Sequence, residues 1–198
     1  SSVAADLSYY GNAVKTTGDG WAWGAVLSNL GSKISYTDNA DAKDFIPANL
    51  GFGANYTNKF NNVNQISIGL EVNKLLVPTP PSDSAGLVDY RNKSVIGSWF
   101  SSFGDAPDGF GEEMKEFAVS MGAEYWYNNQ FALRAGYHYE NKYKGNRRYF
   151  TAGVGLKYNI FGFNFAYLVP SGSGVTRNPL SNTLRFSILF DFSSGGKK

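Results

Sequence analysis

The latter part of the chain alternates between apolar and polar or small residues over long stretches. The alternation runs from Phe117 to Tyr127 and recurs in residues 131–140, 161–169 and 184–192. A repeat of two residues is typical of a β-strand, whose side chains point to opposite faces in turn. Each stretch is near the length that a tilted strand needs to cross a bilayer. Because aromatic residues crowd the apolar face, the pattern favours an all-β, transmembrane antiparallel β-barrel over a soluble sandwich.

The composition agrees with a surface that faces lipid. The 198 residues include 15 Phe, 13 Tyr and 4 Trp, and only 17% of them are charged, whereas about a quarter is usual in soluble domains. A mean hydropathy of −0.29 fits a barrel, because half of each strand is polar. The net charge of +2 is too small to indicate a nucleic-acid partner, and the absence of Cys excludes disulfides and thiolate metal sites.

The alternation predicts about nine strands. They are Val3–Tyr10, Trp21–Thr37, Ala48–Thr57, Gln65–Leu75, Lys115–Tyr127, Gln130–Lys142, Tyr149–Tyr158, Phe161–Val169 and Asn182–Phe192. Within the second strand, Asn29-Leu30-Gly31 indicates a bulge or kink.

Short and long connections alternate along the chain, as they do between the two ends of outer-membrane barrels. Short ones are expected at Asn58–Asn64, Asn128-Asn129 and Asn159-Ile160, and Gly11–Gly20 is an exception with ten residues on the short side. The long connections are Asp38–Pro47, Leu76–Met114, Tyr143–Arg148 and Pro170–Ser181.

A single-chain bacterial barrel has an even number of strands, so nine strands predict that the chain is part of a larger barrel. The start of the sequence lacks the features of an export signal, which favours the same interpretation. We expect residues 1–192 to form the outer-membrane barrel portion, with a long outer loop at 76–114. Residues 193–198 are expected to be a polar tail or a remnant of the expressed sequence.

Four segments resemble the PorV family of the Bacteroidetes type IX secretion system. They are Asn73–Pro81; Trp23-Gly24 with Ser28–Thr37; Ser98-Trp99 with Ser102–Pro107; and Gly136–Glu140 with Asn146–Gly153. That family is similar to the FadL fatty-acid transporter barrels of about fourteen strands, so the resemblance implies that this chain is the C-terminal portion of such a barrel.

The resemblance also implies a function in the bacterial outer membrane. PorV-like proteins bind the C-terminal domains of cargo proteins at the secretion translocon and shuttle the cargo to a surface complex that attaches it. Expected partners are therefore cargo C-terminal domains, translocon subunits, attachment-complex subunits and membrane lipid, and no nucleic acid. The alternative is a FadL-like transporter of hydrophobic small molecules.

The Leu76–Met114 connection is the candidate partner-binding segment, because loops of this length tend to be functional or disordered. Its prolines favour an extended, preorganised backbone, and the spacing of Val95, Ile96, Trp99, Phe100 and Phe103 predicts a helix. The candidate contact residues are Pro78, Thr79, Pro80, Pro81, Trp99, Phe100, Phe103 and Phe110. Alternatively, these aromatic residues cap the barrel mouth or lie at the lipid interface.

The charged residues that share the polar parity of their strands are expected to line the lumen. They are Glu124, Arg134, His138, Glu140, Lys157 and Arg185. A basic cluster at Lys142, Lys144, Arg147 and Arg148 is expected either to bind phosphates or an acidic partner, or to be a solvated loop.

The sequence shows no pattern of catalytic residues. It has no nucleophile–base pair, no cofactor motif and no metal-ligand cluster, and His138 is its only histidine. The chain is therefore expected to have no enzymatic activity, no cofactor and no metal.

Overall fold

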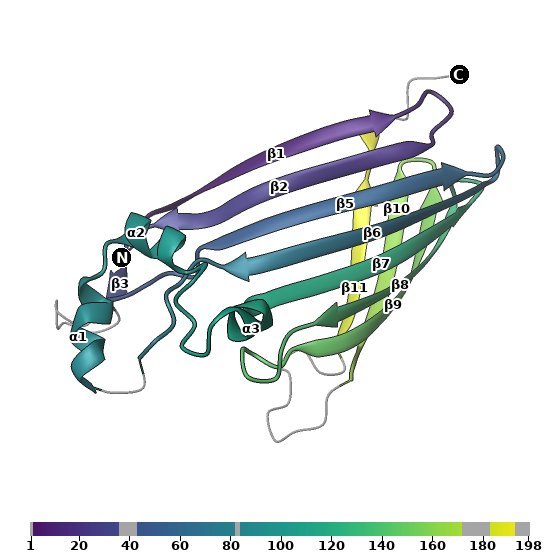
Figure 1. Cartoon of the computed structure of the whole chain (residues 1–198). Helices are drawn as coiled ribbons and strands as arrows, with labels where there is room; N and C mark the ends of the chain where they lie inside the picture. The colour runs from purple at the N-terminus through teal and green to yellow at the C-terminus, as the bar shows by residue number, and fades with distance from the viewer. Residues whose placement is uncertain (1, 36–42, 82–83, 172–182, 193–198) are drawn as a thin grey trace. The chain divides into compact units, whose positions relative to one another are not determined.

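Nine strands form one sheet in the computed structural model of the chain, which describes residues 2–35, 43–81, 84–171 and 183–192. Neighbours in the sheet follow one another along the chain (Figure 1). The strands, in sheet order, are β1 (Ala4–Val14), β2 (Gly20–Gly31), β5 (Asn49–Lys59), β6 (Asn64–Leu75), β7 (Phe117–Tyr127), β8 (Phe131–Tyr139), β9 (Arg148–Tyr158), β10 (Phe161–Pro170) and β11 (Leu184–Phe190).

The short elements lie between these strands. β3 (Ile34–Ser35) pairs with β4 (Lys43–Asp44) in a separate ladder. Between β6 and β7 the chain forms α1 (Ser84–Asn92), α2 (Val95–Ser101), α3 (Phe110–Glu113) and the 3₁₀ helix η1 (Met114–Glu116). No described helix has both the length and the apolar character that a membrane crossing requires.

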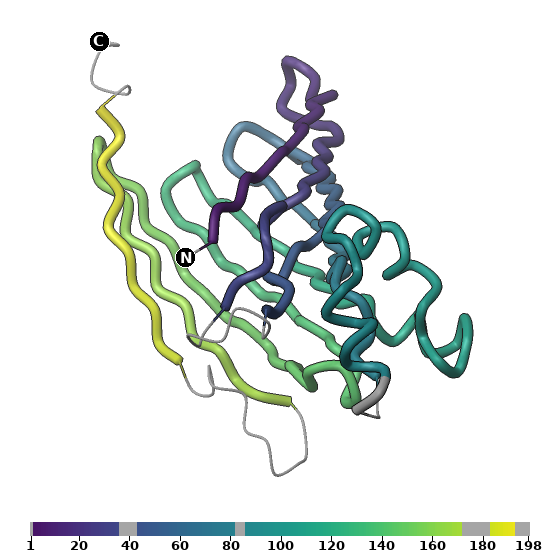
Figure 2. Tube along the Cα trace, turned by 90° about the vertical axis from the view of Figure 1, so that its left-hand side faces the viewer, coloured from purple at the N-terminus to yellow at the C-terminus, as the bar shows by residue number. Residues whose placement is uncertain are grey.

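The residues belong to two compact units. The first comprises Ser1–Tyr10, Gly24–Phe52 and Val72–Ala118 and contains all of these helices. The second comprises Gly11–Trp23, Gly53–Glu71 and Val119–Lys198 and contains β8 to β11, of which β9, β10 and β11 are the green-to-yellow strands that run side by side in Figure 2.

The predicted alternation is confirmed by the cross-strand register of the second unit. One row across β7 to β11 joins Tyr125, Leu133, Val154, Phe165 and Phe186. The neighbouring row joins Glu124, Arg134, Gly153, Ala166 and Arg185. Each strand therefore presents one apolar face and one polar or small face.

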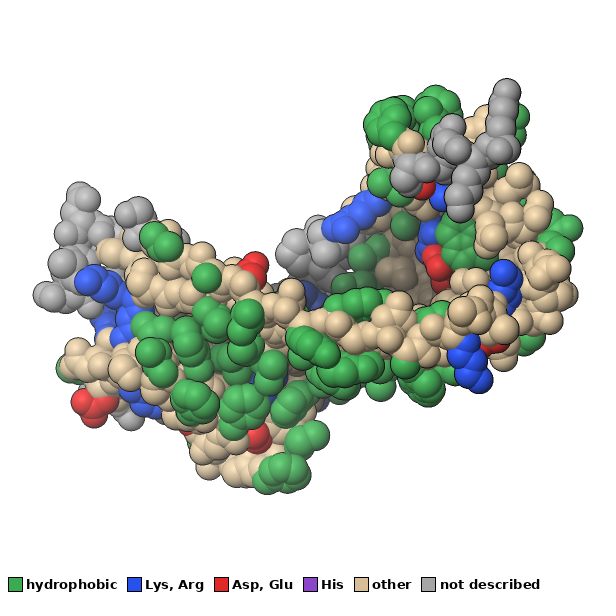
Figure 3. Space-filling view, turned by 90° about the horizontal axis from the view of Figure 1, so that it is seen from above, with side chains coloured by type: hydrophobic (Ala, Val, Ile, Leu, Met, Phe, Trp, Pro, Cys, Tyr) green, Lys and Arg blue, Asp and Glu red, His purple; other side chains and the backbone are tan. Residues whose placement is uncertain are grey.

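The apolar face is exposed rather than packed in a core. Leu133 is 59% exposed, Phe165 45% and Phe186 79%, and hydrophobic side chains form broad green patches in Figure 3. A soluble sandwich would bury this face between two sheets. An apolar face open to its surroundings is what the lipid side of a membrane strand requires, so the fold agrees with an all-β barrel portion. Among the described residues β1 and β11 do not pair, and the sheet is open.

Several predicted boundaries were wrong. β1 continues to Val14 and β2 begins at Gly20, so the connection expected at Gly11–Gly20 is a short turn and no exception to the alternation of loop lengths. The strand expected over Trp21–Thr37 ends at Gly31, where Asn29 has a φ of 56°, which confirms a backbone irregularity at Asn29-Leu30-Gly31.

The two-residue turn at Asn159-Ile160 was predicted correctly, whereas the turn at Asn128-Asn129 also includes Gln130, because Tyr127 pairs with Phe131. Asn128, Asn129 and Asn159 have φ values of 53°, 52° and 52°, a conformation that Asn tolerates better than most residues. In the last strand, β11 spans Leu184–Phe190, and Asn182 lies outside the described residues, as does the tail expected at 193–198.

Candidate functional site

The candidate site is the segment between β6 and β7, residues 76–116, which we call the long loop. It begins two residues after Lys74, a residue of β6 that departs from the apolar alternation of its strand. Ile68, Leu70 and Val72 occupy the apolar parity of β6, and Lys74 follows them on the same parity. A charged group there needs a partner, because an unpaired charge on an apolar face is costly.

The long loop supplies that partner. The Lys74 Nζ lies 2.6 Å from Glu113 Oε1 and 2.7 Å from Glu116 Oε2. The Lys74 side chain is 1% exposed, and those of Glu113 and Glu116 are 7% and 12% exposed. The rings of Phe103 and Phe117 lie 5.4 Å from the same Nζ and add cation–π contacts.

The start of the long loop is bonded to the same cluster. The Thr79 backbone N–H donates to Asp105 Oδ2 at 3.0 Å, and Thr79 Oγ1 lies 3.3 Å from Asp105 Oδ1 and 3.2 Å from Glu116 Oε1. Pro78 is fully buried beside it. We call Lys74, Thr79, Asp105, Glu113 and Glu116 the loop cluster.

A second anchor holds α1. The Lys33 ammonium donates to the backbone oxygens of Arg91 and Lys93, each at 2.6 Å, and lies over the Phe45 ring. These carbonyls belong to the C-terminal end of α1, where a cation is favourable. Partial burial lowers the pKa of Lys33, and the nearby Lys43 lowers it further.

Helix α2 buries the face that carries its small polar residues. Ser94 caps its N-terminus by accepting a hydrogen bond from the Gly97 N–H at 3.1 Å. Ser98 and Ser102, four residues apart on one face, are completely buried, and their hydroxyls donate to the backbone oxygens of Val95 and Trp99. Small residues at this face let the helix lie close to its neighbours.

The opposite side of the helix exposes large apolar side chains. Ile96 and Phe100 of α2, and Phe103 in the turn just after it, follow the i, i+4, i+7 spacing of one helical face and are 63%, 76% and 47% exposed. Phe110 and Met114, in α3 and η1, are 80% and 51% exposed. We call these five residues the apolar surface of the long loop.

The predicted contact residues differ in burial and bonding. Pro78 is buried and Thr79 is bonded within the loop cluster, so both hold the loop in place; Pro81 and Trp99 are half-buried. Pro80, Phe100, Phe103 and Phe110 are exposed. The helix predicted from the spacing of Val95 to Phe103 is confirmed as α2, whereas α1 was not predicted.

On the polar face of the second unit, the predicted side chains are bonded to one another. Arg134 Nε donates to Glu124 Oε2 at 2.5 Å, and its Nη1 donates to Asn164 Oδ1 at 2.7 Å. Gly155 makes room for this group, because a Cβ there would lie 2.8 Å from Arg134 Nη1. The His138 Nδ1 lies 2.9 Å from Ser120 Oγ, and its ring stacks on Tyr149.

The remaining members of the predicted polar set lie apart from that group. Lys157 forms an exposed ion pair with Asp191 at 3.3 Å, and Arg185 is exposed opposite Ala166. Glu140 lies just beyond β8 and binds Arg147 of the predicted basic cluster, at 2.8 Å and 2.7 Å from the guanidinium. Burial tends to raise the pKa of Glu140, but the hydrogen bonds from Arg147 outweigh it and lower the pKa.

The loop cluster was not predicted from the sequence. Lys74, Asp105, Glu113 and Glu116 are separated by up to 42 positions along the chain, so spacing alone does not bring them together. The sequence does contain one indication of the cluster, because Lys74 occupies a position of β6 where the alternation predicts an apolar residue. A charge at such a position predicts that another segment covers it.

Comparison with known proteins gives one family. The family described as "Type IX secretion system protein PorV" matches residues 3–82, which include β1 to β6 and the start of the long loop. Two of the four resembling segments, residues 23–37 and 73–81, lie within this match. No curated protein matches the chain. Residues 3–82 are therefore similar to the PorV family of the type IX secretion system.

Proposed function

We propose that this chain is a non-enzymatic outer-membrane protein that binds the C-terminal domains of secreted cargo and passes the cargo from the translocon to the surface attachment complex. The similarity of residues 3–82 to the PorV family supports the assignment to type IX secretion. The exposed apolar rows of the strands support a location in a lipid bilayer.

The observation that carries the cargo-binding proposal is the inverted burial of α2. This helix and the turn that follows it bury Ser98 and Ser102 and expose Ile96, Phe100 and Phe103, although burial of the apolar side chains would be more favourable in water. Aromatic residues, Phe among them, are enriched in protein interfaces relative to the rest of the surface. The apolar surface of the long loop is therefore the proposed contact for cargo.

The small-molecule transporter is the less favoured function. A path for hydrophobic molecules requires a continuous apolar passage, whereas the polar row of the second unit contains the bonded Glu124–Arg134 pair. Charged pairs on this face suit a water-filled or plugged lumen better than a passage for fatty acids.

A binding experiment tests the proposal. The full chain in detergent is mixed with a purified cargo C-terminal domain, and affinity is compared for wild type, Phe100→Ser, Phe110→Ser and the double variant. We expect each single variant to lose about 1–2 kcal/mol of binding energy, roughly five- to thirtyfold in affinity. Both side chains are exposed, so the fold should survive.

Val88→Ser is the matched control. Val88 is 62% exposed on α1, in the same loop but outside the apolar surface defined above, so this variant should bind cargo as wild type does. Deleting the whole loop is a poorer test, because deletion removes Glu113 and leaves Lys74 buried without one of its partners. Undiminished binding by the double Phe variant contradicts the proposal.

A further inference from the structure

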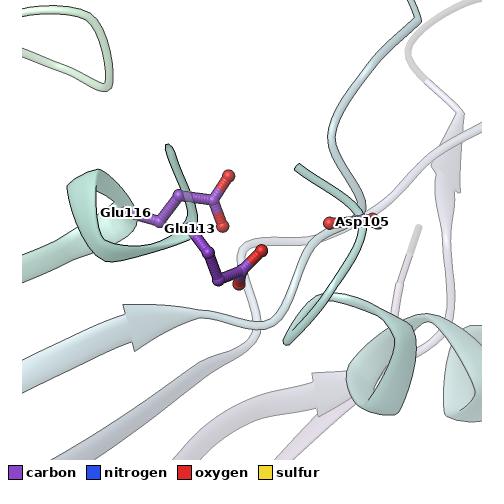
Figure 4. A group of neighbouring side chains, drawn as sticks. All are labelled: Asp105, Glu113 and Glu116. Carbon is purple, nitrogen blue, oxygen red and sulfur yellow. The ribbon is translucent and has the colours of Figure 1, made fainter. Parts of the chain in front are cut away.

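Three carboxylates of the long loop converge on one place. Asp105, in the segment between α2 and α3, approaches Glu113 and Glu116, which come from α3 and η1 (Figure 4). Their ligand-type oxygens all lie within 4.8 Å of one another. Carboxylates repel each other when ionised, so such a grouping needs positive charge or protons nearby.

Glu113 is the member whose bonding is incomplete. The residue is 5% exposed, and within the described part of the chain neither of its carboxylate oxygens accepts a hydrogen bond. Oε1 has an ion-pair contact with Lys74 Nζ at 2.6 Å, but Oε2 is buried without a donor. A buried carboxylate oxygen left in this way is costly and indicates a missing cation or donor.

We propose that Asp105, Glu113 and Glu116 form a binding site for one Ca²⁺ ion, with Thr79 Oγ1 as a further oxygen ligand. Lys74 contacts two of the three carboxylates and supplies a single positive charge to the group. A divalent cation would satisfy Glu113 Oε2 and relieve the repulsion among the carboxylates.

The chemistry and the spacing favour calcium. All the available groups are hard oxygen ligands, which suit Ca²⁺ or Mg²⁺ rather than Zn²⁺. Oxygen atoms on opposite sides of Ca²⁺ lie roughly 4.6–5.2 Å apart, whereas those around Mg²⁺ lie about 4.0–4.2 Å apart. The three oxygens, one from each carboxylate, lie within 4.8 Å of one another, a limit that falls in the range expected around Ca²⁺ and above that expected around Mg²⁺.

The position of the site gives the ion a structural effect. Thr79 belongs to the start of the long loop, Asp105 to its middle, and Glu116 to its end before β7. An ion bound to all of them links three parts of one loop. Calcium binding would therefore fix the backbone that presents Phe100, Phe103 and Phe110.

Calorimetric titration of the full chain in detergent tests this site. The protein is first dialysed against EDTA and then titrated with CaCl₂, and separately with MgCl₂. We expect saturable binding of one Ca²⁺ per chain, with a dissociation constant on the order of 10⁻⁴–10⁻³ M as in extracellular calcium modules, and much weaker binding of Mg²⁺. The same addition of Ca²⁺ should raise the unfolding temperature and protect the long loop from proteolysis.

Variants locate the site. Glu113→Gln and Asp105→Asn keep side-chain volume and should weaken Ca²⁺ binding by roughly tenfold or more, because affinity follows the charge of the ligands. Glu112→Gln is the matched control: its carboxylate accepts from the Asp108 N–H rather than joining the cluster, so binding should be unchanged. The experiment needs no cargo, so its result is independent of the proposed cargo binding.

Two results would overturn the inference. If the wild-type chain shows no saturable Ca²⁺ binding, the three carboxylates only form an ion-paired cluster with Lys74 and are not a metal site. If Glu113→Gln and Asp105→Asn bind Ca²⁺ as tightly as wild type, the ion binds elsewhere.

Discussion

Lys74 and Glu113 form an ion pair in which both side chains are buried, with Nζ 2.6 Å from Oε1 and exposures of 1% and 7%. The pair joins the apolar parity of β6 to the short helix α3. It explains how a lysine is accommodated at a position where the strand pattern calls for an apolar residue. It also makes the conformation of the long loop dependent on a single strand residue.

Replacing Lys74 should therefore be strongly destabilising. Lys74→Met removes the cation and leaves Glu113 and Glu116 buried near each other, and loss of one partner from a buried pair costs about 3–5 kcal/mol. Denaturant unfolding of the full chain in detergent, followed by tryptophan fluorescence, measures this loss. Lys157→Met is the control, because its pair with Asp191 is 46% and 42% exposed and such pairs contribute up to about 1 kcal/mol. Equal losses for both variants would contradict the role of Lys74.

Thr79 should act through its hydroxyl. Thr79→Val keeps the backbone N–H that donates to Asp105 but removes the Oγ1 contacts with Asp105 and Glu116. Loss of a partly buried hydroxyl that bonds carboxylates should cost about 1–3 kcal/mol and speed proteolysis within the long loop. Thr79→Ser restores the hydroxyl and should restore resistance to cleavage. Identical cleavage rates for the Val and Ser variants would show that the hydroxyl has no such role.

The two faces of β10 should respond differently to charge. Phe165 is in the exposed apolar row and Ala166 in the polar row. In a bilayer, Phe165→Arg should cost about 2–4 kcal/mol, as arginine does at the midplane of the lipid face. Ala166→Arg should change stability by about 1 kcal/mol or less, because its repulsion with Arg185 is screened by water. Unfolding from lipid vesicles measures both, and equal costs would contradict the assignment of the faces.

The strands could be predicted because their signal is local. The apolar and polar faces of each strand follow from a repeat of two residues along that strand. In Phe161–Val169, for example, the repeat is visible without knowledge of the neighbouring strands. Strand ends were less predictable, since β1 continues through Gly11 and Asn12, residues that are usual in turns. Their pairing with β2 outweighs the local preference.

The loop cluster could not be assembled from sequence, because its contacts are not local. In the sequence, Glu113 is simply the second of two adjacent acidic residues. It comes close to Glu116 and Lys74 only because α3 and η1 turn the chain there. The sequence also did not predict that α2 buries its polar face and exposes its apolar face. Periodicity identified its apolar face correctly, but whether that face is buried depends on what covers it.

The pair formed by Glu140 and Arg147 should make stability depend on pH. Glu140 is 5% exposed and accepts hydrogen bonds from the Arg147 backbone N–H at 3.1 Å and from its guanidinium at 2.8 Å and 2.7 Å. Burial acts to raise the pKa of Glu140, but these bonds outweigh it, and the pKa lies below the ordinary value of 4.5. The ionised form is therefore favoured in the folded chain.

A lowered folded-state pKa adds stability above the unfolded pKa, and that stability is lost as the pH falls through the folded value. The difference in unfolding free energy between wild type and Glu140→Gln should therefore be largest near neutral pH. It should shrink as the pH falls below about 4.5, where the unfolded carboxyl takes up its proton. Arg147→Gln removes the donor and should lose stability with the same pH dependence. Denaturant unfolding at several pH values measures both differences, and curves that stay parallel to wild type throughout would show that the pair does not control stability in acid.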